Sequence, residues 1–286
     1  MPNLLRSALI LAAFGATGIA QAAVIPANVK VTEVASVPAL NTWYRANVAG
    51  TGTVAEINGS QARNGNGSVE MALSGGNSSK ADYVFTWGYV PGRTLGNLNT
   101  LGFDWFRATS SDTTAHLAPA MRLRYDRDGL ASTTDDLGYL IWEHAYIGTG
   151  APTAAPENTW VSSDILQGDF WQRQSPWTSP TGQKFAGVTI EDYNIDLTEW
   201  MNGSSPANAD KLGAGSAILG IEFGIGSGWS NSFQGNVDNV RFGFAGQTPT
   251  NFNFELAAAD VPEPASLALF GQGVLGFAAA RRRKQK

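Results

Sequence analysis

The sequence contains no cysteine and only two histidines, His116 and His144. A chain without cysteine has no disulfide framework, no thiolate metal site and no cysteine nucleophile. The sequence also lacks the G-x-S-x-G, H-E-x-x-H, Walker and G-x-G-x-x-G motifs of serine hydrolases, zinc proteases and nucleotide-binding proteins. Because His116 lies in a polar stretch, we interpret it as a surface residue. Because disulfides are excluded, the stability of the fold must come from a hydrophobic core or from bound ions.

Glycine, proline and tryptophan are abundant instead, and apolar residues alternate with polar ones in several segments. The stretch "AMRLRYDRDG" directs Met121, Leu123 and Tyr125 to one side. The stretch "AILGIEFGIG" does the same for its alternate apolar residues, Leu219, Ile221, Phe223 and Ile225. Alternation with a period of two indicates half-buried antiparallel strands. We expect residues 23–256 to form an all-β domain, a two-sheet antiparallel β-sandwich of jelly-roll type.

One short helix is predicted in "DLTEWMNG". Asp196 and Glu199 have the spacing of a capping box, and Gly203 is placed to end the helix. The segment before residue 77 is less regular and is expected to contribute irregular chain or edge strands.

The first 22 residues have the pattern of a signal peptide. Arg6 precedes an apolar run from Ala8 to Ala16, and the segment closes on Ala20-Gln21-Ala22, a small-residue cleavage site. We therefore expect a signal helix, cleavage by signal peptidase before Ala23, and export.

Residues 257–286 form a tail of different composition. Pro262 and Pro264 interrupt regular structure, and residues 265–280 carry no charge. As a helix the uncharged stretch would be roughly 24 Å long, short of the ~30 Å hydrocarbon core. Arg281, Arg282, Arg283 and Lys284 follow directly and favour the cytoplasmic side. These features predict a short transmembrane helix, a marginal anchor with its basic end inside.

This tail resembles the PEP-CTERM sorting signal of Gram-negative bacteria. The match consists of Val261, Pro262, Glu263 and Pro264, then the apolar segment, then Arg281, Arg282 and Arg283. The resemblance implies processing by an exosortase, transient retention in the inner membrane, and final placement at the cell surface or outside the cell. Proteins with such tails are typical of bacteria that make exopolysaccharide and grow in biofilms.

The body between the two address segments is acidic. Residues 23–260 hold 13 of the 19 lysines and arginines and 23 of the 24 aspartates and glutamates, a net charge of −10. A body of this charge is a poor partner for nucleic acid. Its end, with Val237, Asp238, Asn239 and Val240, resembles the last strands of jelly-roll carbohydrate-binding and lectin-like domains.

The stretch "YDRDGLASTTDDLGY" is a candidate calcium site. Asp126, Asp128, Asp135 and Asp136 offer hard oxygen ligands around Gly129, although the spacing is not that of an EF-hand. An ordinary Asp-x-Asp-Gly turn is the alternative.

The stretch "GDFWQRQSPWTSP" is a candidate glycan-binding loop. Trp171 and Trp177 supply flat apolar rings and Arg173 supplies hydrogen-bond donors, a combination suited to sugars. The alternative is that these tryptophans fold back onto the core.

Carboxylates in "IEDYNIDLTEW" raise the question of a glycosidase, but Asp196 and Glu199 are better explained as the helix cap. We assign no catalytic residue. The leading hypothesis is a non-catalytic surface protein that binds glycan or exopolysaccharide. A purely structural envelope or matrix component and a polysaccharide-degrading enzyme are the alternatives.

Overall fold

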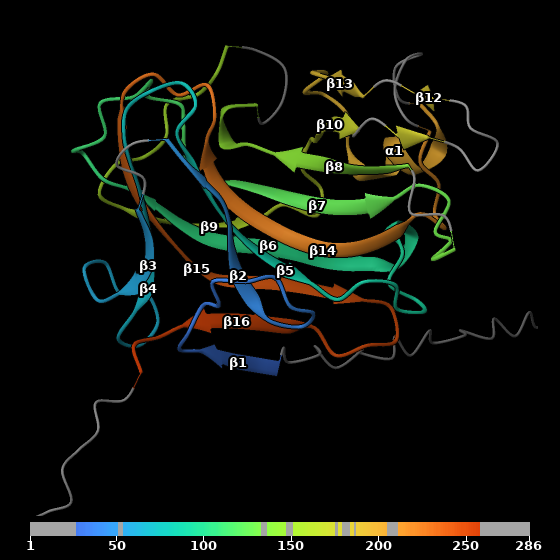
Figure 1. Cartoon of the computed structure of the whole chain (residues 1–286), viewed down its shortest axis with the longest axis horizontal. Coiled ribbons are helices and arrows are strands. Elements are labelled where there is room, and N and C mark those ends of the chain that lie inside the picture. Colours follow the sequence, from blue (N-terminus) through green and yellow to red (C-terminus); the bar gives the residue numbers. More distant parts are fainter. Residues whose placement is uncertain are drawn as a thin grey trace, which may run out of the picture.

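The computed structural model describes residues 27–257, apart from 51–53, 133–135, 147–150, 175–176, 179–183, 186 and 205–210. Two seven-stranded sheets pack face to face (Figure 1). Sheet A contains β1 (Ala27–Val31), β3 (Val54–Asn58), β4 (Ser68–Ser74), β6 (Leu98–Arg107), β9 (Trp160–Asp164), β15 (Ser232–Phe244) and β16 (Thr250–Phe254). The prediction of an all-β, two-sheet sandwich is confirmed.

Sheet B has the order β13-β10-β8-β7-β14-β5-β2. Its strands are β2 (Trp43–Ala49), β5 (Lys80–Thr86), β7 (Ala120–Asp126), β8 (Leu137–Trp142), β10 (Trp171–Gln174), β13 (Val188–Ile190) and β14 (Ala217–Gly226). All pairings within sheet B are antiparallel. The smaller elements are β11 (Trp177–Thr178), β12 (Lys184–Phe185), the short 3-10 helices η1 (Leu95–Asn97) and η2 (His144–Tyr146), and α1 (Leu197–Asn202).

The core lies between the two sheets and is rich in aromatic rings. The residues predicted to face inward on β7 and β14 do so, because Met121, Leu123 and Phe223 are fully buried. Trp43 on β2 is surrounded by rings from both sheets, with centroids 5.2–5.4 Å away, from Phe85, Phe223, Phe252 and Phe254. Burial of this aromatic surface is the main source of stability in a chain without disulfides.

The Val-Asp-Asn-Val segment lies in β15, the longest strand. A bulge with Asn239 in a left-handed conformation lets both Val237 and Val240 face the core. Asp238 accepts hydrogen bonds from the backbone N–H groups of Phe254 (2.8 Å) and Asn64 (3.3 Å). The motif therefore fastens β16 and the loop after β3 to sheet A.

The predicted helix is present with the expected ends. Asp196 and Glu199 form a reciprocal capping box, and Gly203 adopts the left-handed conformation at the C-terminus. Helix α1 is also tied to sheet B, because the Trp200 indole donates a 3.0 Å hydrogen bond to the Phe170 carbonyl. This contact fixes the chain just before β10.

The expectation that "GDFWQRQSPWTSP" is a loop was wrong for the first half of this stretch. Residues 171–174 form β10, which pairs with β8 on one side and β13 on the other. Phe170, by contrast, belongs to the core and is fully buried. The strand lacks the usual alternation of apolar and polar residues, because its buried residue, Gln172, is polar.

The two address segments lie outside the described residues, and so do the signal cleavage site and the expected C-terminal helix. Among the residues that the structure describes, no helix has the length and apolar character needed to cross a membrane.

Candidate functional site

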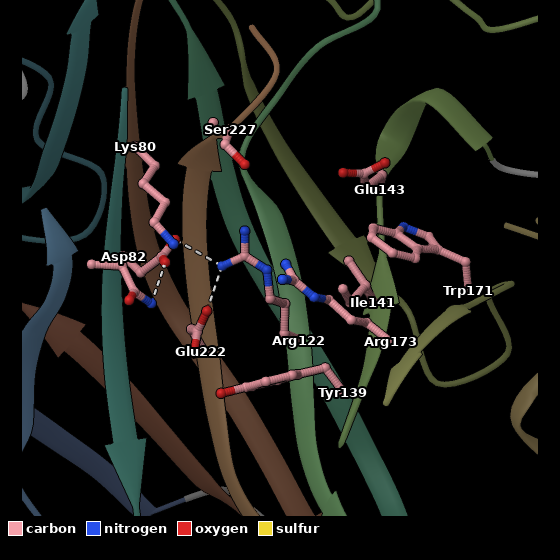
Figure 2. A pocket seen from close by; sticks show the side chains of 12 residues that line it. Lys80, Asp82, Arg122, Tyr139, Ile141, Glu143, Trp171, Arg173, Glu222 and Ser227 are labelled. Carbon is pink, nitrogen blue, oxygen red and sulfur yellow. Dashed lines mark hydrogen bonds and ion pairs between the residues drawn. The ribbon is translucent and has the colours of Figure 1, made fainter. Parts of the chain in front are cut away.

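A groove of about 280 Å³ opens on the outer face of sheet B, the face turned away from sheet A (Figure 2). Six neighbouring strands, from β10 to β2, line it together with the residues that follow β8 and β14. Most of the lining is polar or charged: Asn47, Lys80, Asp82, Arg122, Tyr139, Ile141, Glu143, Trp171, Arg173, Glu222, Gly226 and Ser227. The site therefore stands on a sheet rather than on loops, which holds its side chains in fixed positions.

Strand register sets the order of the groove residues. Glu222 on β14 is opposite Arg122 on β7, Arg122 is opposite Ile141 on β8, and Ile141 is opposite Trp171 on β10. Residues opposite each other share a face. One row across four strands thus runs from an acidic side chain through a basic and an apolar one to an aromatic ring.

Arg122 is the centre of a buried ion-pair triad at one end of this row. Its Nη1 donates to Asp82 Oδ1 at 2.8 Å and to Glu222 Oε1 at 2.5 Å (Figure 2). Asn47 completes the cluster by donating to Asp82 Oδ2 at 2.9 Å. Burial lowers the pKa of Arg122, but the two carboxylates outweigh it and raise that pKa. Burial raises the pKa of Glu222 despite the nearby guanidinium.

Gly224 makes the triad possible. It lies on β14 directly opposite Asp82, and a Cβ atom there would overlap the Asp82 carboxylate and approach Arg122 Nη1 to 2.8 Å. The absence of a side chain lets the Asp82 carboxylate cross the strand to reach Arg122. This glycine is thus required for close approach, not for a turn.

Aromatic rings form the opposite end of the groove and continue beyond it. Trp171 is half-buried and contacts Tyr193 edge-on, with centroids 6.4 Å apart. Tyr193 stacks on Tyr146 at 3.7 Å. Glu143 lies beside Trp171 in Figure 2, and burial raises the pKa of its carboxyl group. This end offers flat apolar surface next to hydrogen-bonding groups.

Two of the three predicted glycan-binding residues line this groove. Trp171 and Arg173 are two positions apart on β10, so both side chains point to the outer face, and Arg173 is exposed. Trp177 is the first residue of β11, and its side chain is not among those that the structure describes.

The charged residues of the triad were not singled out from the sequence. Asp82 lies between the buried residues Ala81 and Tyr83 of β5, and Glu222 interrupts an otherwise uncharged β14. Arg122 on β7 is likewise flanked by buried neighbours. Isolated charges in central strands are the signal that could have revealed them. That these three residues lie close together depends on the order of the strands in the sheet, which the alternation of residues within each strand does not reveal.

The predicted calcium loop brings three of its four carboxylates together. Ligand atoms of Asp126, Asp128 and Asp136 lie within 4.8 Å of one another, and Asp135 is outside the described residues. Asp126 Oδ1 accepts the Gly129 N–H at 2.9 Å, so the loop is also an Asp-stabilised turn. Burial raises the pKa of Asp126 to about 6. The calcium site remains a prediction.

The other sequence candidates do not form a cluster in the groove. Asp196 and Glu199 cap α1, as expected. His116 is half-buried, not fully exposed, and its ring lies 6.3 Å from that of Tyr146.

Comparison with known protein families gives one match, in the C-terminal tail. Residues 260–284 match the PEP-CTERM protein-sorting motif. The chain carries a PEP-CTERM tail. The PEP-CTERM tail implies an exported protein that is processed by an exosortase. No curated protein sequence matches the chain.

The solved structures that are similar to this chain share little sequence with it. A β-1,2-glucanase from Parabacteroides distasonis is 13% identical with a TM-score of 0.32. The alignment covers 71% of this chain but only 23% of the glucanase. A family 11 carbohydrate-binding module from Clostridium thermocellum, solved with a β-1,3-1,4-mixed-linked tetrasaccharide, is 10% identical, with a TM-score of 0.31 and coverage of 77% and 93%.

A third structure is a protein of unknown function from Shewanella oneidensis. It is 11% identical with a TM-score of 0.23, and the alignment covers 80% of this chain and 94% of that protein. Likenesses this distant do not indicate what the groove binds.

Proposed function

We propose that this exported protein binds glycan, without catalysis, in the groove on the outer face of sheet B. It would act at the cell surface or in the extracellular matrix after its tail has been processed. The observation that carries the proposal is the half-buried Trp171 ring at the end of a hollow lined by polar side chains. Sugars present apolar C–H faces and hydroxyl groups, and this surface offers partners to both.

The groove also favours binding over a purely structural role. A structural component needs a surface for self-association, whereas this hollow is rich in side chains that donate and accept hydrogen bonds. The paired strands of sheet B hold it in shape, so little conformational freedom is lost when a ligand binds.

A polysaccharide-degrading enzyme is the second candidate, and one observation favours it. The groove contains three carboxyl groups, and burial raises the pKa of two of them, Glu143 and Glu222. Glycosidases use a pair of carboxyl groups, one of them with a raised pKa. However, Asp82 and Glu222 are both bound to Arg122, which leaves Glu143 as the carboxyl group available to a sugar.

The test is retention on an immobilised exopolysaccharide column. Trp171→Ala should reduce affinity about tenfold or more, because stacking and burial of one ring contribute roughly 1.4 kcal/mol. The matched control is Trp160→Ala, which removes another half-buried tryptophan, on β9 of the opposite sheet. Thermal melts of both variants separate lost binding from lost folding.

Equal retention of the wild type, Trp171→Ala and Arg173→Gln would show that the groove is not the site. New reducing ends released from the column material by the wild type, and absent with Glu143→Gln, would instead establish the enzyme.

A further inference from the structure

The distribution of positive charge on sheet B indicates which glycans fit the groove. Lys80 on β5, Arg122 on β7 and Arg173 on β10 all line it, although the body as a whole is acidic. Among the described residues, neither Lys80 nor Arg173 has a carboxylate within ion-pair distance. Lys80 and Arg173 thus share the hollow with a third cation, and Lys80 attracts the Glu222 carboxylate without forming a direct ion pair with it.

Arg122 keeps donors directed to the groove. Both of its ion pairs use Nη1, and within the described part of the chain no hydrogen bond is formed by Nε or Nη2. An arginine carries five N–H donors, so most of its capacity is left for another acceptor. Figure 2 shows the Arg122 and Arg173 guanidinium groups pointing into the same hollow.

Holding like charges together is unfavourable unless an anion lies between them. A carboxylate on a sugar ring would provide that anion, because it pairs with the planar guanidinium through two parallel hydrogen bonds. The acidic side chains of the groove do not oppose this. Asp82 and Glu222 are bound to Arg122. Glu143 lies beside Trp171 (Figure 2), and its carboxyl group is also attracted by Arg122 but forms no ion pair with it among the described residues.

We propose that the groove recognises an acidic polysaccharide, with the anionic group of one sugar held between Arg122, Arg173 and Lys80 while a neighbouring ring stacks on Trp171. This inference rests on the proposed glycan binding and adds the charge of the ligand. A uronic acid carboxylate and a sulfate ester share the required chemistry.

The experiment compares charged polymers with their uncharged forms. The full chain is purified in a polyoxyethylene detergent, which has no sugar headgroup, and is titrated with polygalacturonate, alginate and hyaluronan. Each polymer is paired with its methyl-esterified form, which keeps the rings and removes the charge. Dextran sulfate and dextran provide the sulfate arm.

We expect at least one acidic polymer to bind about tenfold or more tightly than its uncharged form, because charge-assisted hydrogen bonds are lost on esterification. Arg173→Gln and Lys80→Gln should each remove most of that preference. Lys30→Gln, an equal charge change on an exposed residue of β1 in the opposite sheet, should leave it unchanged.

The outcomes separate the two proposals. Equal binding of acidic and esterified polymers, lost in Trp171→Ala but kept in Arg173→Gln, would overturn the charge inference and leave glycan binding in place. Absence of binding to every polymer, charged or neutral, would count against both. A preference confined to dextran sulfate would assign the groove to sulfate esters instead of uronic acids.

Discussion

Replacing Arg122 with methionine would keep much of the side chain's volume and remove its charge and its hydrogen bonds. The Asp82 and Glu222 side chains, 3% and 7% exposed, would lose the cation they share. Removing one partner of a buried ion pair costs about 3–5 kcal/mol, because the remaining charge is poorly hydrated where it lies. We expect Arg122→Met to lose that much unfolding free energy at pH 7. For a domain of this size, the loss corresponds to a melting temperature lower by roughly 6–20 °C.

The loss should depend on pH in a defined direction. Burial already raises the pKa of Glu222, and removal of Arg122 raises it further. A carboxyl group with a higher pKa in the folded state contributes stability at low pH that is lost as the pH rises through that pKa. The difference between wild type and Arg122→Met should therefore be smaller at pH 5 than at pH 7.

Urea denaturation followed by tryptophan fluorescence, at both pH values, measures this difference. Arg124→Met is the matched control. Arg124 lies two positions further along β7 and faces the same side, and no carboxylate of the described residues lies within ion-pair distance of it. A loss of less than about 1 kcal/mol in Arg122→Met, equal to that of the control and independent of pH, would show that the triad behaves as a solvated surface pair.

Two further predictions concern the tail and the acidic loop. Changing Pro262 and Pro264 to alanine should leave uncleaved, membrane-retained precursor, and intact-mass analysis that finds Lys286 on released wild-type protein would contradict exosortase processing. Millimolar Ca²⁺ should raise the melting temperature of the wild type but not of Asp128→Ala, because a ligand that binds only the folded state stabilises it. This gain in melting temperature should be smaller at pH 5, below the Asp126 pKa of about 6, because protons then compete with the ion for the carboxylates. Identical melting temperatures with calcium and with a chelator would show that the loop is an ordinary turn that binds no calcium.

The sandwich could be predicted because its strands satisfy a local rule. Met121 and Leu123 on β7 and Phe223 on β14 alternate with polar or small residues, and burial of one face of each strand fixes the register of the whole sheet. The cap of α1 was equally local, since Asp196 and Glu199 are three residues apart. Such features need no knowledge of which strands become neighbours.

The groove could be predicted only in part, because most of its residues are brought together by contacts between strands that are distant in the sequence. Trp171 and Arg173 are close in sequence and were recognised together, although on a strand and not in a loop. Asp82, Arg122 and Glu222 come from three strands that are far apart along the chain, and the order β7-β14-β5 brings them together. Alternation says that each faces outward, but strand order is set by the packing of the whole domain.

The triad itself is poorly explained as a device for stability. Replacing a buried ion pair with apolar side chains of similar volume is often neutral or stabilising, and Gly224 adds the cost of a glycine within a strand. An apolar patch at this position would need no glycine and no third charged residue. The arrangement instead fixes one groove-lining guanidinium on a rigid sheet, with Nε and Nη2 forming no hydrogen bond within the described part of the chain, at the cost of burying two carboxylates. That preorganisation is what an anionic sugar would require of its binding site, since the donors are already in place before it arrives.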